Sequence, residues 1–248
     1  MASTTDDTTL LWLRPEPSGR KPRYTRAEIV RTAIGLADRE GFEAVTMKRI
    51  AAELGAGTMT LYYYVRNKAD IVALMQDAIF SDVLVPAGQL PGDWREAVTV
   101  IARRSRDALV GHPWSVSSLN QAQFGPNAMA HYEQSLAALA ATTLDYPQKA
   151  EVTAILDDYV VGSATHTIEV QERLRAAAGN TTLLAEAKAY GDALMSTGAF
   201  PELAALTEHA TDTAGPEGGI GPLAHLDRQF ETGLAALLDG IGRHYAIG

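Results

Sequence analysis

The sequence lacks cysteine and any long hydrophobic run. With no cysteine among its 248 residues, the chain has no disulfide, no thiolate metal site and no cysteine nucleophile, which fits a reducing cytoplasm. No apolar run approaches the roughly 18 residues of a membrane span, and the apolar cluster at residues 10–13 follows two aspartates rather than a basic segment. Because 46% of the side chains are apolar, we expect a folded, soluble chain without a signal peptide or membrane anchor.

Positive charge is scarce overall but concentrated near one end. The formal net charge of -9 argues against a general nucleic-acid binder, because binding a polyanion requires local positive potential. Residues 12–68, however, hold eleven Lys and Arg against six Asp and Glu, a net charge of +5. Residues 81–248 hold ten against twenty, a net charge of -10. The basic block is either a solvated face or a surface for nucleic acid.

The first 23 residues contain three prolines and few apolar groups, so we predict a flexible basic arm over residues 1–23. Its last residues, 19–23, read Gly-Arg-Lys-Pro-Arg. Extended segments of this kind can enter a narrow minor groove, where negative potential favours guanidinium groups. Arg20 and Arg23 are therefore candidate DNA contacts, with an ordinary solvated tail as the alternative.

Residues 24–86 have the pattern of a helix-turn-helix domain with a linking helix. Thr25 and Glu28 form a capping box before a first helix that runs to Gly41. Thr46 can cap a second helix that stops at Gly55, and Thr58 can cap a short third helix to residue 65. Asn67 can cap a fourth helix that stops before Pro86. Two short helices joined by a tight glycine turn form a helix-turn-helix.

Residues 87–248 show helical periodicity and no sustained strand pattern. The spacing predicts helices over residues 93–110, 126–143, 147–177 and 223–245, and the Gly- and Pro-rich end of residues 198–222 predicts a loop. The expected fold is all-α, with a helix-turn-helix domain joined by its linking helix to a helical bundle for ligand binding and dimerisation.

Two apolar seams favour a homodimer built as a four-helix bundle, although each seam alone could be an internal core stripe. The seams belong to the helix at residues 147–177 and to the last helix. The candidate interface residues are Tyr159, Ser163, Phe230, Leu234, Leu237 and Ile241.

Residues 58–64 are the candidate reading surface. Leu61 can face the small core, and threonine and tyrosine hydroxyls on the other faces can reach phosphates or base edges. Methyl groups of Met59 and Thr60 can meet thymine methyls. In a competing interpretation one tyrosine, Tyr63 by preference, packs inward.

At residues 25–79 the sequence resembles the tetracycline-repressor (TetR) family. The resemblance is carried by the capped first helix, the run Thr-Met-Lys-Arg-Ile-Ala-Ala-Glu-Leu-Gly at 46–55, the Leu-Tyr-Tyr-Tyr core at 61–64 and the Asn-Lys pair at 67–68. Motifs at 93–96, 112–114, 125–128 and 158–162 resemble the family's regulatory domain. The resemblance implies DNA contacts at Lys48, Thr58, Met59, Thr60, Tyr62, Tyr63, Tyr64 and Lys68.

The same resemblance implies a cytoplasmic homodimeric repressor that binds a palindromic double-stranded operator and is released by a small-molecule effector, with an efflux or antibiotic-related gene as one option for its target. Candidate ligand-lining residues are Trp114, Phe124, His131, Gln134, Asp157, Thr165 and His166. Each has a structural alternative, Trp114 as a core anchor and His166 as a seam residue. Leu84 stands where the tetracycline repressor has a metal-drug histidine, and the acidic regulatory half leans toward a cationic or polar aromatic effector.

An enzyme and a protein-binding scaffold are the alternatives. The sequence has no His-Glu-x-x-His pair, no Gly-x-Ser-x-Gly elbow and no phosphate-binding glycine loop. Asp157 and Asp158 are adjacent and therefore point to different faces of a helix, unlike a paired acid and base. We expect no catalytic residue, metal site or cofactor. A scaffold role would leave the surface at residues 58–64 unexplained.

Overall fold

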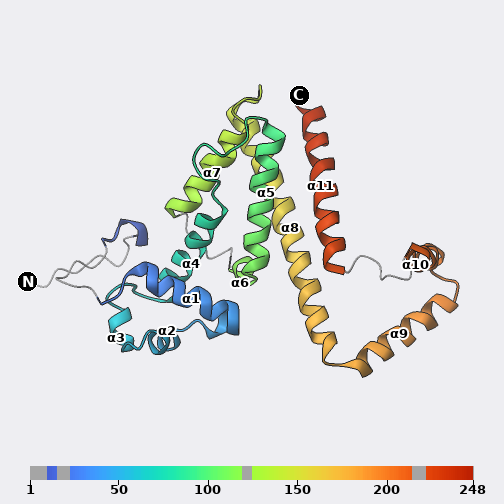
Figure 1. Cartoon of the computed structure of the whole chain (residues 1–248), viewed down its shortest axis with the longest axis horizontal. Coiled ribbons are helices and arrows are strands. Elements are labelled where there is room, and N and C mark those ends of the chain that lie inside the picture. Colours follow the sequence, from blue (N-terminus) through green and yellow to red (C-terminus); the bar gives the residue numbers. More distant parts are fainter. Residues whose placement is uncertain (1–9, 16–22, 119–124, 214–221, 248) are drawn as a thin grey trace, which may run out of the picture. The chain divides into compact units, whose positions relative to one another are not determined.

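The computed structural model describes residues 10–15, 23–118, 125–213 and 222–247, and the regular elements in these ranges are all helices (Figure 1). The predicted all-α class is confirmed. The chain forms two compact units, one of Met1–Ala164 with Gly242–Gly248 and one of Thr165–Ile241. Arg20 and Phe124, two of the predicted site residues, lie outside the described ranges. None of the described helices is both long and apolar enough for a membrane span.

The first unit begins with the elements predicted from its capping residues. They are η1 (Leu11–Leu13), α1 (Arg26–Glu40), η2 (Phe42–Ala44), α2 (Met47–Glu53), α3 (Thr58–Leu61) and α4 (Lys68–Val83). Thr25 and Glu28 form the predicted capping box, and Thr46 and Asn67 accept hydrogen bonds from the backbone amides of Arg49 and Asp70. Each accepted bond satisfies an amide that the first helical turn leaves unpaired.

The turn between α2 and α3 depends on Gly55, whose φ of +63° lies in the left-handed region that disfavours a side chain. The helix that follows is a single turn, shorter than the predicted segment to residue 65. Its N-cap is Gly57, so the prediction that Thr58 caps it is wrong. Because α3 ends at Leu61, Tyr62 is its C-cap and the next two tyrosines lie in a turn.

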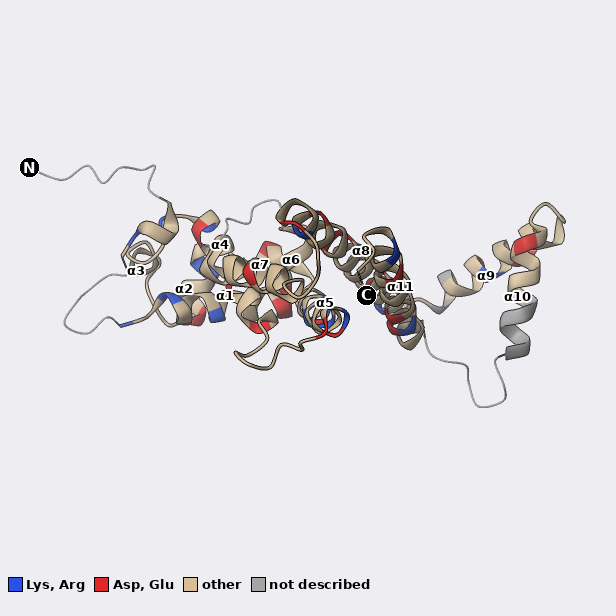
Figure 2. Cartoon of the chain, turned by 90° about the horizontal axis from the view of Figure 1, so that it is seen from above, with Lys and Arg blue, Asp and Glu red and all other residues tan. Residues whose placement is uncertain are grey.

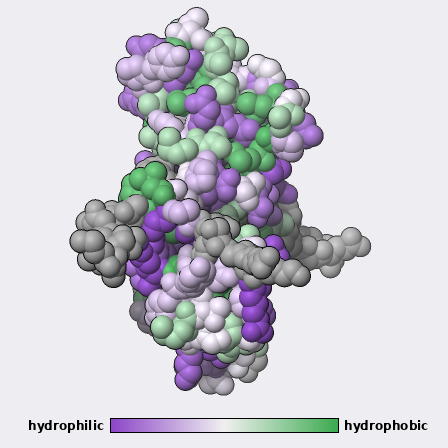
Figure 3. Space-filling view, turned by 90° about the vertical axis from the view of Figure 1, so that its left-hand side faces the viewer, coloured by the Kyte–Doolittle hydropathy of each residue, from purple (hydrophilic) through white to green (hydrophobic). Residues whose placement is uncertain are grey.

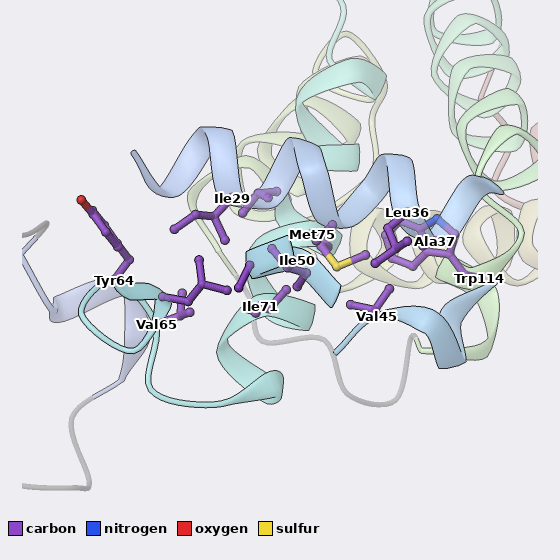
Figure 4. Packing of buried hydrophobic residues seen from close by; sticks show 14 of the residues in the cluster. Ile29, Leu36, Ala37, Val45, Ile50, Tyr64, Val65, Ile71, Met75 and Trp114 are labelled. Carbon is purple, nitrogen blue, oxygen red and sulfur yellow. The ribbon is translucent and has the colours of Figure 1, made fainter. Parts of the chain in front are cut away.

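A hydrophobic core holds α1, α2, α3 and α4 together. Figure 4 shows this cluster as a row of side chains with Tyr64 at one end and Trp114 at the other. Between them, Ile29, Ile50 and Met75 come from three different helices and are fully buried. Burying such a side chain contributes about 1.5 to 3 kcal/mol. The short α3 is therefore positioned by packing rather than by its own helical stability.

The remainder of the first unit surrounds α4 with α5 (Trp94–Gly111), α6 (Trp114–Ser117), α7 (Pro126–Ala138) and the first part of α8 (Tyr146–Ala178). Both α5 and α7 pack against α4 (Figure 1). Asp93 caps α5 as predicted, and α7 begins at Pro126 as predicted. The helix α4 thus belongs both to the core of α1–α4 and to the helices that follow it.

The second unit contains the remainder of α8, then α9 (Thr181–Ser196), α10 (Pro201–Thr213) and α11 (Pro222–His244) up to residue 241. The loop predicted for residues 198–222 is wrong over α10, because the cluster of Gly and Pro that suggested it begins only at Gly215.

The structure also changes the interpretation of the α11 seam. Phe230, Leu234 and Ile241 are already buried within the single chain, with exposed fractions of 2%, 1% and 5%. Side chains buried in one chain are not available to a partner, so their assignment to a dimer interface is wrong. Tyr159, Ser163 and Leu237 are only partly buried, and their assignment stays a prediction.

Part of the arm predicted to be flexible is packed on the domain. Leu11 is buried, and the Arg14 guanidinium forms an ion pair with the buried carboxylate of Asp70 at the start of α4. Arg26 donates hydrogen bonds to the backbone carbonyls of Arg14 and Pro15. Although burial raises the pKa of Asp70, hydrogen bonds from Arg14 and from the Arg66 backbone amide hold it below its ordinary value. One buried side chain and a paired charge offset the ordering entropy of this segment.

Candidate functional site

The surface around α3 exposes side chains that a folded core would ordinarily bury. Met59 is 79% exposed, Tyr63 67% and Tyr62 45%, while Thr58 and Thr60 are partly exposed. Figure 3 faces this side, and the part of the molecule at the bottom of the view mixes hydrophilic and pale side chains without a continuous apolar patch. Hydroxyl, thioether and aromatic groups displayed together suit contacts with base edges and phosphates.

Tyr64 is the tyrosine that packs inward, so its assignment as a DNA contact is wrong, as is the alternative in which Tyr63 does so. Tyr64 is 6% exposed and belongs to the core, and its hydroxyl accepts a hydrogen bond from the backbone amide of Tyr24 at 3.3 Å. The Tyr63 ring meets it edge-on, with ring centroids 5.7 Å apart. Tyr63 and Tyr64 point in different directions because they lie in the turn after Leu61, where helical geometry no longer determines side-chain direction.

Figure 2 marks both basic and acidic positions on α1 and α2, and two arginines of the basic block form ion pairs within the domain. Arg39 pairs with Glu53 at 2.6 Å and Arg49 with Glu40 at 2.6 Å, so neither contributes a free charge to a polyanion. Lys48 is exposed on α2.

Two further predicted contacts lie against aromatic rings. The Lys68 ammonium is 4.7 Å from the centre of the Phe42 ring, and the Arg23 guanidinium is 5.6 Å from that of Tyr24. Lys68 remains partly exposed at the first turn of α4. The reading surface thus combines a few cations with the exposed groups of residues 58–63.

A cavity of about 310 Å³, here called the α4–α8 cavity, lies among α4, α5, α7 and α8. Its walls are mainly apolar, and α4 supplies five of the lining residues. The lining residues are Gln76, Asp77, Ile79, Phe80, Val83, Ser105, Ala108, Leu109, Ala128, His131, Tyr132, Asp157, Val160 and Val161. A concave apolar site with a few polar groups is typical of small-molecule binding.

Asp157 is the ionisable group of this cavity with the strongest perturbation. The protein that surrounds it and the neighbouring Asp158 carboxylate raise the pKa of Asp157 to about 6, although its side chain stays accessible. Burial lowers the pKa of His131, which favours the neutral imidazole. The His131 Nδ1 and the Ser105 Oγ are buried without a hydrogen-bond partner among the described residues. Buried polar atoms without partners are rare and point to a missing ligand or water.

Of the seven predicted ligand residues, His131 and Asp157 line the cavity. Gln134 does not, because its amide exchanges two 2.9 Å hydrogen bonds with the backbone of Val85. Thr165 and His166 are not among the lining residues and belong to the second unit. The lining side chains of α4 were missed, although Ile79, Phe80 and Val83 show the spacing of one helix face.

Trp114 is not a cavity residue either. It is 4% exposed in the core of the α1–α4 helices, where its ring stacks on Phe42 with centroids 6.3 Å apart. Its Nε1 donates to the Asp38 carboxylate at 2.8 Å, and the Nδ1 of His112 lies 2.8 Å from the same oxygen. The α5–α6 junction is therefore joined to α1 by a hydrogen-bonded and stacked contact.

Hydrogen bonds with the surrounding helices hold the middle and the C-terminal end of α4. Asp77 accepts hydrogen bonds from the backbone amides of Asn127 and Ala128 and so caps the N-terminus of α7. Arg104 of α5 donates to three backbone carbonyls of residues 82–84, at 2.6 to 2.9 Å. Gln76 donates to the backbone carbonyl of Ser115 at 2.8 Å. The helix held by these hydrogen bonds, α4, lines the cavity along its second half and begins at Lys68.

Comparison with known families and proteins identifies this arrangement. Residues 87–245 match the family model of the tetracyclin repressor-like C-terminal domain, and residues 29–75 match that of bacterial regulatory proteins of the tetR family. The chain belongs to the TetR family. It is a DNA-binding transcriptional regulator and not an enzyme.

Two relatives illustrate the TetR assignment. The HTH-type transcriptional repressor DrrR1 of Streptomyces coeruleorubidus is 34% identical over 243 residues, which cover 94% of this chain and 83% of DrrR1. Among solved structures, the Streptomyces coelicolor TetR family protein ActR in complex with actinorhodin is 28% identical, with a TM-score of 0.66 over 88% of this chain and 95% of ActR. Regulators of the TetR family bind DNA and small-molecule effectors and are dimers.

The raised pKa of Asp157 predicts a measurable effect on the stability of this TetR-family chain. Because the folded state holds a proton more tightly than the unfolded state, Asp157 destabilises the fold at neutral pH, and the penalty fades as the pH falls through about 6. Asp157→Asn should raise the melting temperature at pH 7.5 by about 1 to 2 °C, a small gain because the carboxylate stays partly solvated. The gain should shrink as the pH falls below about 6 and disappear only below about 3.8, the ordinary pKa of this carboxyl, so thermal unfolding of both proteins at pH 7.5 and at pH 3.5 checks it. An equal gain at both values would contradict the assignment.

Proposed function

We propose that this chain is a homodimeric cytoplasmic repressor whose two α3 surfaces read a palindromic operator and whose α4–α8 cavity binds the effector that releases it. The observation that carries the proposal is that one helix, α4, begins at Lys68, five residues after Tyr63, and supplies five of the residues that line the cavity. Recognition surfaces related by a two-fold axis would enter successive major grooves about 34 to 36 Å apart.

Release would follow from a change in α4. A ligand shifts an equilibrium only through its different affinity for the two arrangements. A ligand that contacts Ile79, Phe80 and Val83 would gain that difference if its binding displaces α4 relative to the core that holds α3. The complex of ActR with actinorhodin supports a small organic molecule as the kind of effector.

The test uses DNA upstream of the protein's own coding region and two variants. Wild type should bind this DNA as a dimer, measured by fluorescence anisotropy and sedimentation. Lys68→Gln should weaken binding to operator and random DNA alike. The slope of the logarithm of the binding constant against the logarithm of the salt concentration should fall in magnitude by about 1 for each phosphate that the variant no longer neutralises. Thr60→Val should instead change the preference among operator base substitutions.

Equal, sequence-blind losses in both variants would contradict the assigned roles. A dimer without affinity for this DNA or for a randomised double-stranded library would contradict the repressor proposal and favour a protein-binding scaffold.

A further inference from the structure

We infer that the α4–α8 cavity takes an amphipathic cation, a flat apolar body carrying a protonated amine that pairs with Asp157. The inference rests on the proposed function, which supplies the cavity's role as an effector site, and adds the chemical class of the ligand. The lining includes two carboxylates, Asp77 and Asp157, and no Lys or Arg among its described residues.

The two carboxylates differ in what compensates them. Asp77 is engaged at the N-terminus of α7, where Asn127 and Ala128 amides donate to the same oxygen at 3.0 Å and the Asn127 side chain donates to the other at 3.0 Å. Among the described residues, none forms a hydrogen bond or an ion pair with Asp157, and its nearest charged influence is the like charge of Asp158. Asp157 is therefore the carboxylate whose oxygens are available to accept hydrogen bonds from a ligand.

The polar atoms around Asp157 are few and unpartnered. His131 is more than nine-tenths buried in the cavity wall, and its Nδ1 lacks a hydrogen-bond partner. Ser105 is only partly buried, but its Oγ atom is buried and also lacks a partner. A smaller space of about 20 Å³ next to the cavity shares Ser105 and Asp157 with it and is lined by Thr153, whose hydroxyl is also unpartnered. An ammonium group has three donors, which a carboxylate and two such acceptors would satisfy.

The remaining walls define the body of the ligand. Ile79, Phe80, Leu109, Val160 and Val161 give an apolar surface that suits fused rings. An anionic ligand would meet the Asp157 carboxylate in walls without a cation, and an uncompensated charge in apolar surroundings is strongly disfavoured. A neutral ring system would fill the space but leave the carboxylate unpaired.

The test compares three fluorescent anthracenes that differ in one group: 9-(aminomethyl)anthracene, 9-anthracenemethanol and 9-anthracenecarboxylate. Titration into the full-length protein at pH 7.5, followed by anthracene fluorescence, gives the three dissociation constants. The amine should bind at least about tenfold more tightly than the alcohol, as expected for a hydrogen bond to a charged group. The carboxylate should bind most weakly.

Asp157→Asn should reduce the affinity for the amine to that for the alcohol and leave the alcohol unchanged. Asp158→Asn is the matched control, since it removes the same charge one residue away from the lining, and it should keep the preference for the amine. Binding of the alcohol reports that each variant is folded.

The outcomes separate the inference from the proposed function. Equal binding of amine and alcohol, or a preference that survives Asp157→Asn, overturns the cation and leaves the effector cavity standing. Failure of all three compounds to bind overturns the inference. The repressor proposal is not affected by that result, because operator affinity is measured in a separate experiment. A preference that depends on Asp157, without any effect of the amine on operator binding, supports the cation and contradicts effector release.

Discussion

Replacing Tyr63 by alanine should lower operator affinity by a factor of about 30 or more. Tyr63 is 67% exposed beside α3, and removing a base-edge interaction costs about 1 to 3 kcal/mol. In a homodimer the loss occurs in both half-sites, so about 2 to 6 kcal/mol of binding free energy disappears. Fluorescence anisotropy with labelled operator at one fixed salt concentration measures the change.

Two tyrosines provide the comparison. Tyr146→Ala removes a ring that is 80% exposed at the start of α8, and operator affinity should stay at the wild-type value. Tyr64→Phe removes only a hydroxyl of a core side chain, so it should cost a small amount of stability and little affinity. Wild-type affinity in Tyr63→Ala would contradict the assignment of the reading surface.

Replacing Trp114 by alanine should lower the free energy of unfolding by about 3 to 5 kcal/mol, the range for a buried aromatic side chain. The ring fills one end of the core of α1–α4, stacks on Phe42 and donates to Asp38 (Figure 4). Its removal leaves a cavity and an exposed junction between α6 and α1. Urea unfolding followed by circular dichroism gives the value.

Trp114→Phe keeps part of the packing and removes the hydrogen bond. It leaves an aromatic ring in the core but loses the Nε1 donor and the volume of the second indole ring, so a cost of about 1 to 3 kcal/mol is expected, below that of the alanine variant. The Asp38 carboxylate retains its contact with His112, which limits the loss. Equal losses in the alanine and phenylalanine variants would show that the hydrogen bond, not the packing, dominates.

Local signals in the sequence predicted the fold well. Capping at Thr25, Thr46, Asn67 and Asp93 depends on a side chain and an amide within three residues, and all four caps are confirmed. The all-α class and the helix-turn-helix followed from such signals together with apolar periodicity. Contacts of this kind can be predicted from the sequence because both partners are close neighbours along the chain.

Long-range pairing accounts for the errors. The sequence places Trp114 wrongly in the ligand site because its partners, Asp38 and Phe42, lie more than seventy residues earlier in the chain. The directions of the tyrosines at 63 and 64 could not be predicted, because α3 ends one turn after it begins. Asp157 and His131 do line the cavity, and their role as ligand contacts stays a prediction.

Because α4 contributes both to the core of α1–α4 and to the cavity, it restricts how the ligand specificity of such a protein can change. A substitution at Ile79 or Phe80 that suited a new effector would also disturb the helix that carries Met75 into that core. Ser105, Tyr132 and Asp157 are not among the residues of that core and are less restricted by it. During evolution, new ligand specificities should therefore arise first on α5, α7 and α8, while α4 changes slowly.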